Sequence, residues 1–167
     1  MTDLPAYPEE AAQREEEAPA ETGRQLSGWW RRAGAYVVDT VITVFGISVI
    51  FLVAFALAAV IPSDAIAGIL AIIGVVAAIA FPIWYFTYFH GNVQGQTIGK
   101  RAFGIRVRGD ETGGPIGYGR AFGRYAITVV FGFFFFPVIL DYLWPLWDGK
   151  NQTLHDKVVG SVVEHVS

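Results

Sequence analysis

Two long apolar runs dominate the first half of the chain. Residues 34–61 contain a single charged residue, Asp39, and residues 65–89 contain none. About 20 apolar residues span the roughly 30 Å hydrocarbon core of a bilayer, so each run is long enough to cross it as a helix. The Pro-Ser-Asp segment at 62–64 is typical of a tight turn, because proline ends a helix and serine or aspartate caps the next. The pattern therefore predicts an antiparallel transmembrane hairpin.

A third apolar segment covers about residues 122–147 and is interrupted by Pro137, Asp141 and Pro145. Two interpretations fit this pattern. The segment is either a single crossing, which leaves the C-terminus outside, or a helix that breaks at Pro137, re-enters and returns the tail to the cytoplasm.

Period-two alternation predicts two short strands. Ile105 and Val107 alternate with Arg106 and Arg108, and glycines follow. The sequence GSVVEH at 160–165 has the character of a partner strand, which favours the re-entrant interpretation. The fold class is thus an all-α integral membrane protein: a transmembrane hairpin and a Pro-broken third helix, with short strands in the cytoplasmic loop and the C-terminal tail.

Charge divides the chain into a tail and a membrane domain. Residues 1–27 carry seven acids and two arginines, a net charge of −5, and have the Glu-, Ala- and Pro-rich composition of a disordered tail. We therefore expect the folded domain to cover residues 28–167. The chain has no cysteine, which rules out disulfides and thiolate chemistry.

Basic residues also predict the orientation. The loop at 90–124 holds six lysines and arginines against two acids, whereas the 62–64 turn has no base. The positive-inside rule then places the N-terminus and the 90–124 loop in the cytoplasm of a multi-pass protein of the plasma membrane.

Asp39 is the first candidate for a functional residue. At 3.6 residues per turn, Arg32, Asp39 and Thr43 share one helix face. An acid within a membrane helix is costly and usually pairs with a base or faces a watery cavity. One interpretation is an ion or proton site, with Arg32 as the counter-charge of Asp39. The other is a buried Arg–Asp pair that only fixes helix packing.

The remaining candidates lie in the loop and the tail. Lys100 and Arg101 are placed either to reach anionic headgroups or to support the Asp39 site from below, with Gln96 and Thr97 nearby.

In the tail, Thr153 and Asp156 have the spacing of a capping box. His155 is either a proton relay or a packing residue at the interface. The histidines lack metal-ligand spacing, and no nucleophile–base arrangement occurs, so we expect no metal, no cofactor and no enzymatic activity.

Three segments, WRRAGAYVVD, GQTIGKRAFGIRV and QTLHDKVVGSVV, resemble the signature segments of the RDD family of small membrane proteins. The family is named for one arginine and two aspartates. The resemblance implies that Arg32 and Asp39 match the first two and Asp156 the third, over about residues 28–163. It also implies a role in transport, since some members have been linked to sodium–proton exchange.

Two functions therefore stay open. The first is ion or small-solute transport, including cation/proton exchange, through a polar site of Arg32, Asp39, Thr43 and Asp156. The second is a non-transporting accessory or scaffold protein, in which buried charges fix the helices and the acidic tail recruits a partner. The expected partners are the lipid bilayer and a second copy or another membrane protein, and nucleic acid is not expected.

Overall fold

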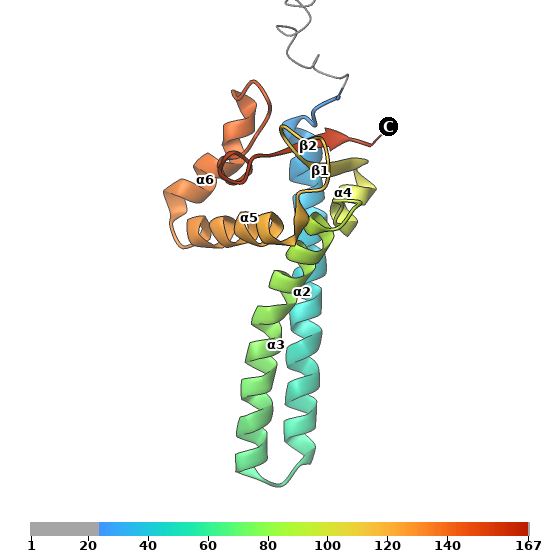
Figure 1. Ribbon diagram of the computed structural model, residues 1–167. Helices are drawn as coiled ribbons and strands as arrows, with labels where there is room; N and C mark the ends of the chain where they lie inside the picture. Colours follow the sequence, from blue (N-terminus) through green and yellow to red (C-terminus); the bar gives the residue numbers. More distant parts are fainter. Residues whose placement is uncertain (1–23, 167) are drawn as a thin grey trace, which may run out of the picture.

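The computed structural model describes residues 24–166, and two long helices form its hairpin. α2 (Trp29–Val60) and α3 (Asp64–Gly91) run antiparallel and project from the rest of the molecule (Figure 1). Both are long and apolar enough to cross a membrane. The predicted hairpin is thus present, whereas most of the predicted acidic tail, residues 1–23, lies outside the described residues.

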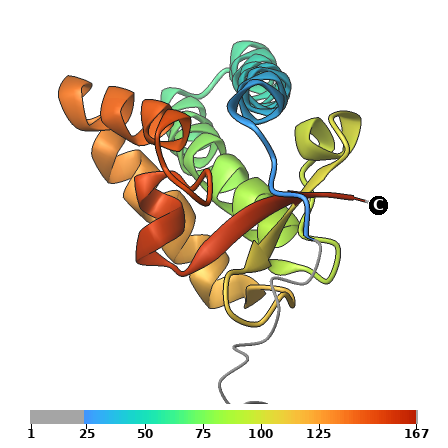
Figure 2. The same ribbon diagram turned by 90° about the horizontal axis from the view of Figure 1, so that it is seen from above.

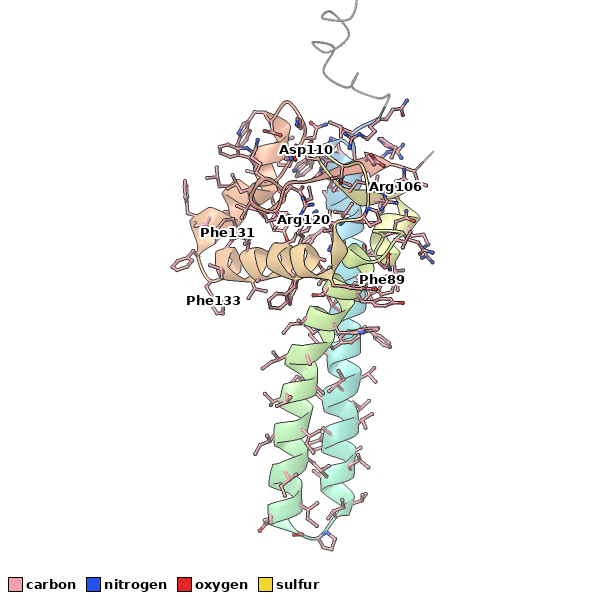
Figure 3. The ribbon with its side chains drawn as sticks, viewed as in Figure 1. Phe89, Arg106, Asp110, Arg120, Phe131 and Phe133 are labelled. Carbon is pink, nitrogen blue, oxygen red and sulfur yellow. The ribbon has the colours of Figure 1, made fainter. Side chains whose placement is uncertain are left out.

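The surface of the hairpin is apolar over most of its length. Phe55 and Val60 are 74% and 75% exposed, and Figure 3 shows hydrocarbon side chains along both helices, with nitrogen and oxygen atoms gathered at the opposite end of the molecule. A soluble protein rarely exposes apolar surface on this scale. The hairpin is therefore suited to a lipid environment, which solvates these side chains.

A two-stranded sheet covers the polar end of the hairpin. β1 (Ile105–Gly109) follows the short helix α4 (Ile98–Ala102), and it pairs antiparallel with β2 (Ser161–His165). Val107 lies opposite Val163 in the register. The pairing expected between the loop and the tail is confirmed.

Residues 24–27, at the end of the predicted tail, lie beside β2. The Ser27 amide donates to the carbonyl of Val163 at 2.8 Å, and Leu26 forms a bridge with Glu164.

The small hydrophobic core lies below this sheet. It joins the sheet to α2 and to residues 116–121, where the helix after β1 begins. Its buried residues are Ala35, Ile105, Val107, Ile116, Ala121 and Val163.

The third apolar segment folds as two helices that do not follow the hairpin. α5 (Gly117–Gly132) runs across it, and α6 (Phe135–Leu143) turns back toward the sheet (Figures 1 and 2). The chain then passes through a 3-10 turn (Trp144–Leu146) and α7 (Leu154–Val158) into β2. The tail thus returns to pair with β1, and whether the third segment crosses or re-enters the membrane stays a prediction.

The predicted break at Pro137 is displaced. The helix ends at Gly132, and Pro137 lies in the first turn of α6, three residues after Phe134. The first-turn amides of a helix have no partner within it, so a proline is tolerated there. The interruption therefore precedes the proline that appeared to mark it.

The core below the sheet allows a test of the fold. Replacing the fully buried Ile105 with alanine removes side-chain atoms from a packed site, so we expect the free energy of unfolding in detergent micelles to fall by about 2–5 kcal/mol. Val158→Ala is the control, since Val158 is 69% exposed. Equal losses for both variants would contradict the assignment of this core.

Candidate functional site: a buried charge cluster and its cavity

Asp39 is buried and bound by uncharged donors. Its Oδ1 accepts from the Tyr85 hydroxyl at 2.8 Å and from the Gly99 amide at 2.8 Å, and its Oδ2 accepts from the Thr97 hydroxyl at 2.6 Å. These donors come from α3 and from the start of α4, and Asp39 itself is 1% exposed. Its carboxylate therefore fixes the 90–124 loop onto both membrane helices.

The close approach of α4 to α2 depends on Gly99. A Cβ atom at this position would collide with the carbonyl oxygen of Ala35 and would lie 2.8 Å from Cγ of Asp39. Thr97 caps α4, and its hydroxyl also accepts from the Lys100 amide. The segment GQTIGK is thus a short capped turn that presents a hydroxyl and an amide to the acid.

Arg32 does not pair with Asp39, which corrects the counter-charge assigned above. Asp39 lies seven residues further along α2, a rise of about 10 Å, and this exceeds the reach of an arginine side chain. The guanidinium instead contacts Asp156, with 2.7 Å between Nη1 and Oδ2.

Asp156 lies between two guanidiniums. Arg124 of α5 contacts its Oδ1, opposite the contact from Arg32, and the Ser161 hydroxyl donates to the same oxygen at 2.8 Å. Burial alone would raise the pKa of Asp156, but the charges of Arg124 and Arg32 hold it well below its usual range. The predicted capping box with Thr153 is also present. This carboxylate joins α2, α5 and α7.

A third buried acid, Asp141, contacts His155. Nδ1 of His155 lies 2.6 Å from Oδ2 of Asp141, and the His155 amide donates to Oδ1 of the same carboxylate at 2.9 Å. A carboxylate at Nδ1 favours the tautomer with its hydrogen there, which leaves the lone pair on Nε2. Burial lowers the pKa of His155 and the Arg124 charge adds to this, while the bond to Asp141 opposes them.

These groups surround a cavity of about 550 Å³, which we call the hairpin cavity. Side chains from α2, α3, α5 and α6 line it, together with residues of the loop and α7. Its charged and histidine lining consists of Arg32, Asp39, His90, Lys100, Arg124 and His155.

The other predicted site residues take different positions. The Thr43 hydroxyl lines the cavity but donates to the backbone carbonyl of Asp39 at 2.9 Å rather than to its carboxylate. Lys100 is buried and lines the cavity, whereas Arg101 is exposed and bonds Gln94 on the surface. Gln96 donates to the Ile105 carbonyl, away from Asp39.

Sequence reasoning missed four members of this site: Tyr85, His90, Arg124 and Asp141. Asp141 interrupts an apolar run, and an acid among apolar residues is the same signal that identifies Asp39 as a candidate. Arg124 was counted with the loop bases. Tyr85 and His90 carry no signal beyond their place at the end of a membrane helix.

The fold and the site define a membrane protein built on a helical hairpin, with buried arginine–aspartate contacts at one end. The profile of the RDD family matches residues 26–160, and the chain belongs to this family. Arg32, Asp39 and Asp156, the residues expected from the resemblance to match the family's arginine and two aspartates, all lie at this end of the hairpin.

Curated relatives match part of the chain. The proline-rich antigen homologs of two Mycobacterium tuberculosis strains are each 34% identical over 87 residues, 52% of this chain and 35% of theirs. The proline-rich antigen of Mycobacterium leprae is 35% identical over 85 residues, 51% of this chain and 32% of its own length. The chain thus covers about a third of these relatives. No solved structure matches it.

The position of Asp156 between two arginines predicts a pH-dependent contribution to stability. At pH 7, Asp156→Asn leaves two buried guanidiniums without their carboxylate, so we expect a loss of about 3–5 kcal/mol in the free energy of unfolding. Because the folded pKa is depressed, this contribution is complete above the unfolded pKa of 3.8 and is lost as the pH falls through the folded value.

The measurement is detergent-micelle unfolding of wild type and variant across pH. Their difference should be constant from neutral to mildly acidic pH and shrink only in strong acid. Asp110→Asn is the control, since Asp110 pairs with the exposed Lys150 and should contribute at most about 1 kcal/mol. A difference that already disappears near neutral pH would contradict the assignment.

Proposed function

We propose that this chain contributes to the transport of an ion or small solute across the plasma membrane, with the hairpin cavity as the binding site. One observation supports this most directly: a cavity with six charged or histidine side chains lies beside two helices that are long enough to cross a membrane. Ionisable groups at such a position are costly, and they commonly mark solute pathways. The function is one of binding and movement rather than of catalysis.

The proposed orientation places the cavity toward the cytoplasm. The bases of the 90–124 loop lie at the same end of the molecule as the cavity, and the positive-inside rule assigns that end to the cytoplasmic side. The described part of the chain has two helices suited to spanning. Two helices alone cannot surround a continuous pathway across a bilayer. A complete pathway therefore calls for a second copy of the chain or another membrane protein.

Proton coupling, if the transported species requires it, is best served by His155. The carboxylates of Asp39 and Asp156 already accept from several donors each, so both are engaged within the fold. His155 instead lines the cavity, has its Nδ1 engaged by Asp141 and keeps Nε2 available for a proton. The charges that act on it are those of Arg124, Asp141 and Asp156.

Purified protein in pyranine-loaded proteoliposomes tests this proposal. With an imposed sodium or potassium gradient, we expect wild type to change the internal pH faster than empty vesicles do. His155→Gln should reduce that rate about tenfold or more, because a side chain that carries the proton is lost. His165→Gln is the matched control, since His165 lies on β2 outside the cavity lining. Equal rates for all three proteins would contradict proton coupling through His155.

A second candidate is a non-transporting accessory protein. The observation that favours it is the degree to which buried acids are occupied: Asp39 joins α2, α3 and α4, and Asp156 joins α2, α5 and α7. Contacts of this kind hold a scaffold together without moving an ion. The proposed recruitment of a partner by the acidic tail concerns residues that lie mostly outside the described part.

Asp39→Asn separates the two candidates. An amide presents a donor to at least one of the three groups that now donate to Asp39, so we expect a loss of about 1–3 kcal/mol or more in the free energy of unfolding. Chromatography and mass measurement in native-like lipid discs report assembly, and the vesicle assay reports flux. Impaired assembly together with no wild-type flux under any gradient supports the accessory function. Wild-type flux contradicts it.

A further inference from the structure

Several basic side chains of the hairpin cavity have nitrogen atoms that bind no acid within residues 24–166. Nη1 of Arg32 binds Asp156, but its Nη2 is buried and has no hydrogen-bond partner among residues 24–166. In the same part of the chain, both ring nitrogens of His90 are buried and unpartnered. The ammonium group of Lys100, a residue only 9% exposed, also makes no hydrogen bond or ion pair there. All three side chains line the cavity.

The acids near these groups are already engaged. Among residues 24–166, Asp39 is the one acid that lines the cavity. Its carboxylate accepts from three uncharged donors. Asp156 is shared by two arginines, and Asp141 is bound to His155. Burial lowers the pKa of Lys100 to about 8, and the charge of Arg124 acts in the same direction, while the charges of Asp39 and Asp156 oppose them without a direct contact. A buried cation without a partner is unfavourable, so this end of the cavity favours an anion.

The shape of the cavity adds a second property. On α2 its lining extends from Trp29 to Ile47, which is about 27 Å along the helix. On α3 the lining residues change from His90 to Phe86 and then Pro82 with distance from the sheet. The cavity is thus basic at the end near the loop and apolar along the hairpin.

We propose that the hairpin cavity binds an amphiphile through its phosphate group, with Lys100 and Arg32 contacting the phosphate oxygens and the apolar part of the ligand lying along α2 and α3. This names the ligand class for the cavity of the proposed function and rests on that function only for the choice of site. The phosphate belongs either to a membrane phospholipid or to a water-soluble phosphate ester that also carries an apolar group.

Phosphate suits these groups better than a carboxylate does. A guanidinium offers paired N–H donors in a fixed plane, and a lysine adds a point charge with three further donors. A tetrahedral phosphate has enough oxygens to accept from both at once and from an imidazole N–H as well. It also supplies hydrogen-bond acceptors to groups that the occupied acids of the site leave unpartnered.

Calorimetric titration of the purified full chain in dodecyl maltoside tests the proposal with three probes: dihexanoyl phosphatidic acid, inorganic phosphate and the uncharged dihexanoylglycerol. We expect saturable binding of the phosphatidic acid and no comparable binding of dihexanoylglycerol. Lys100→Gln should weaken binding about tenfold or more, whereas Arg101→Gln should change it by less than about twofold. Arg101 is the matched control because it is the next residue, carries the same charge and is exposed.

The two sources of phosphate give different results. Binding of phosphatidic acid that inorganic phosphate does not displace assigns the site to a membrane phospholipid. Displacement by inorganic phosphate assigns it to the phosphate group itself, as in a water-soluble ester. Both results support the proposal, provided that Lys100→Gln weakens binding and its unfolding temperature shows that the variant is folded.

Equal binding of dihexanoylglycerol and phosphatidic acid to wild type would overturn the proposal, because the cavity would then select only an apolar body. Equal effects of Lys100→Gln and Arg101→Gln would overturn it as well, since general surface charge would explain both. The titration uses no ion gradient, so its outcome is independent of the vesicle assay. Failure of phosphate binding leaves the transport proposal to be decided by flux, and absence of flux leaves binding intact.

Discussion

The contact of one carboxylate with two guanidiniums organises this fold. Asp156 lies on α7, near the C-terminus, and it meets Arg32 from the start of the first membrane helix and Arg124 from α5. Two buried arginines without an acid would be expensive next to a bilayer, and a buried acid without them equally so. The return of the chain to β1 therefore depends on the pairing of Asp156 with both arginines as much as on burial of the small apolar core.

The two aspartates Asp156 and Asp39 are held in different ways. Asp156 is held by positive charge, which keeps its pKa low. Asp39 is held by a phenol, an alcohol and an amide, none of which is charged. Because Arg32 pairs with Asp156, it makes no ion pair with Asp39. Lys100 also lines the cavity, where the charge of Asp39 opposes the effect of burial on the Lys100 pKa.

Hydropathy and alternation were enough to predict the elements that depend on local pattern. Neighbouring residues predict the hairpin, the turn at 62–64, the strand at 105–109, its partner at 161–165 and the Thr153–Asp156 cap. The ion pair between Arg32 and Asp156 does not follow from local pattern, because the two residues are 124 positions apart. The position of Asp39 on the same helix face as Arg32 pointed to the wrong partner. The burial of Lys100 depends on how closely α4 packs on α2, which in turn depends on the absence of a side chain at Gly99. These features arise from packing between distant segments, and local patterns carry little information about them.

The antiparallel pairing of β1 with β2 has a mechanical consequence. It places Gly109 opposite Ser161, so the 51 residues between them leave the sheet and return to the same place. The two helices of the hairpin likewise leave this end of the molecule and return to it. The hairpin and α5 form two walls of the cavity. They are held together at one end by the contacts of Asp156 and by the stacking of Phe86 on Tyr125. Their far ends, at the 62–64 turn and at Phe133, lie apart (Figures 1 and 3). The separation of these two walls is therefore fixed at the base, where Asp156 binds Arg32 and Arg124.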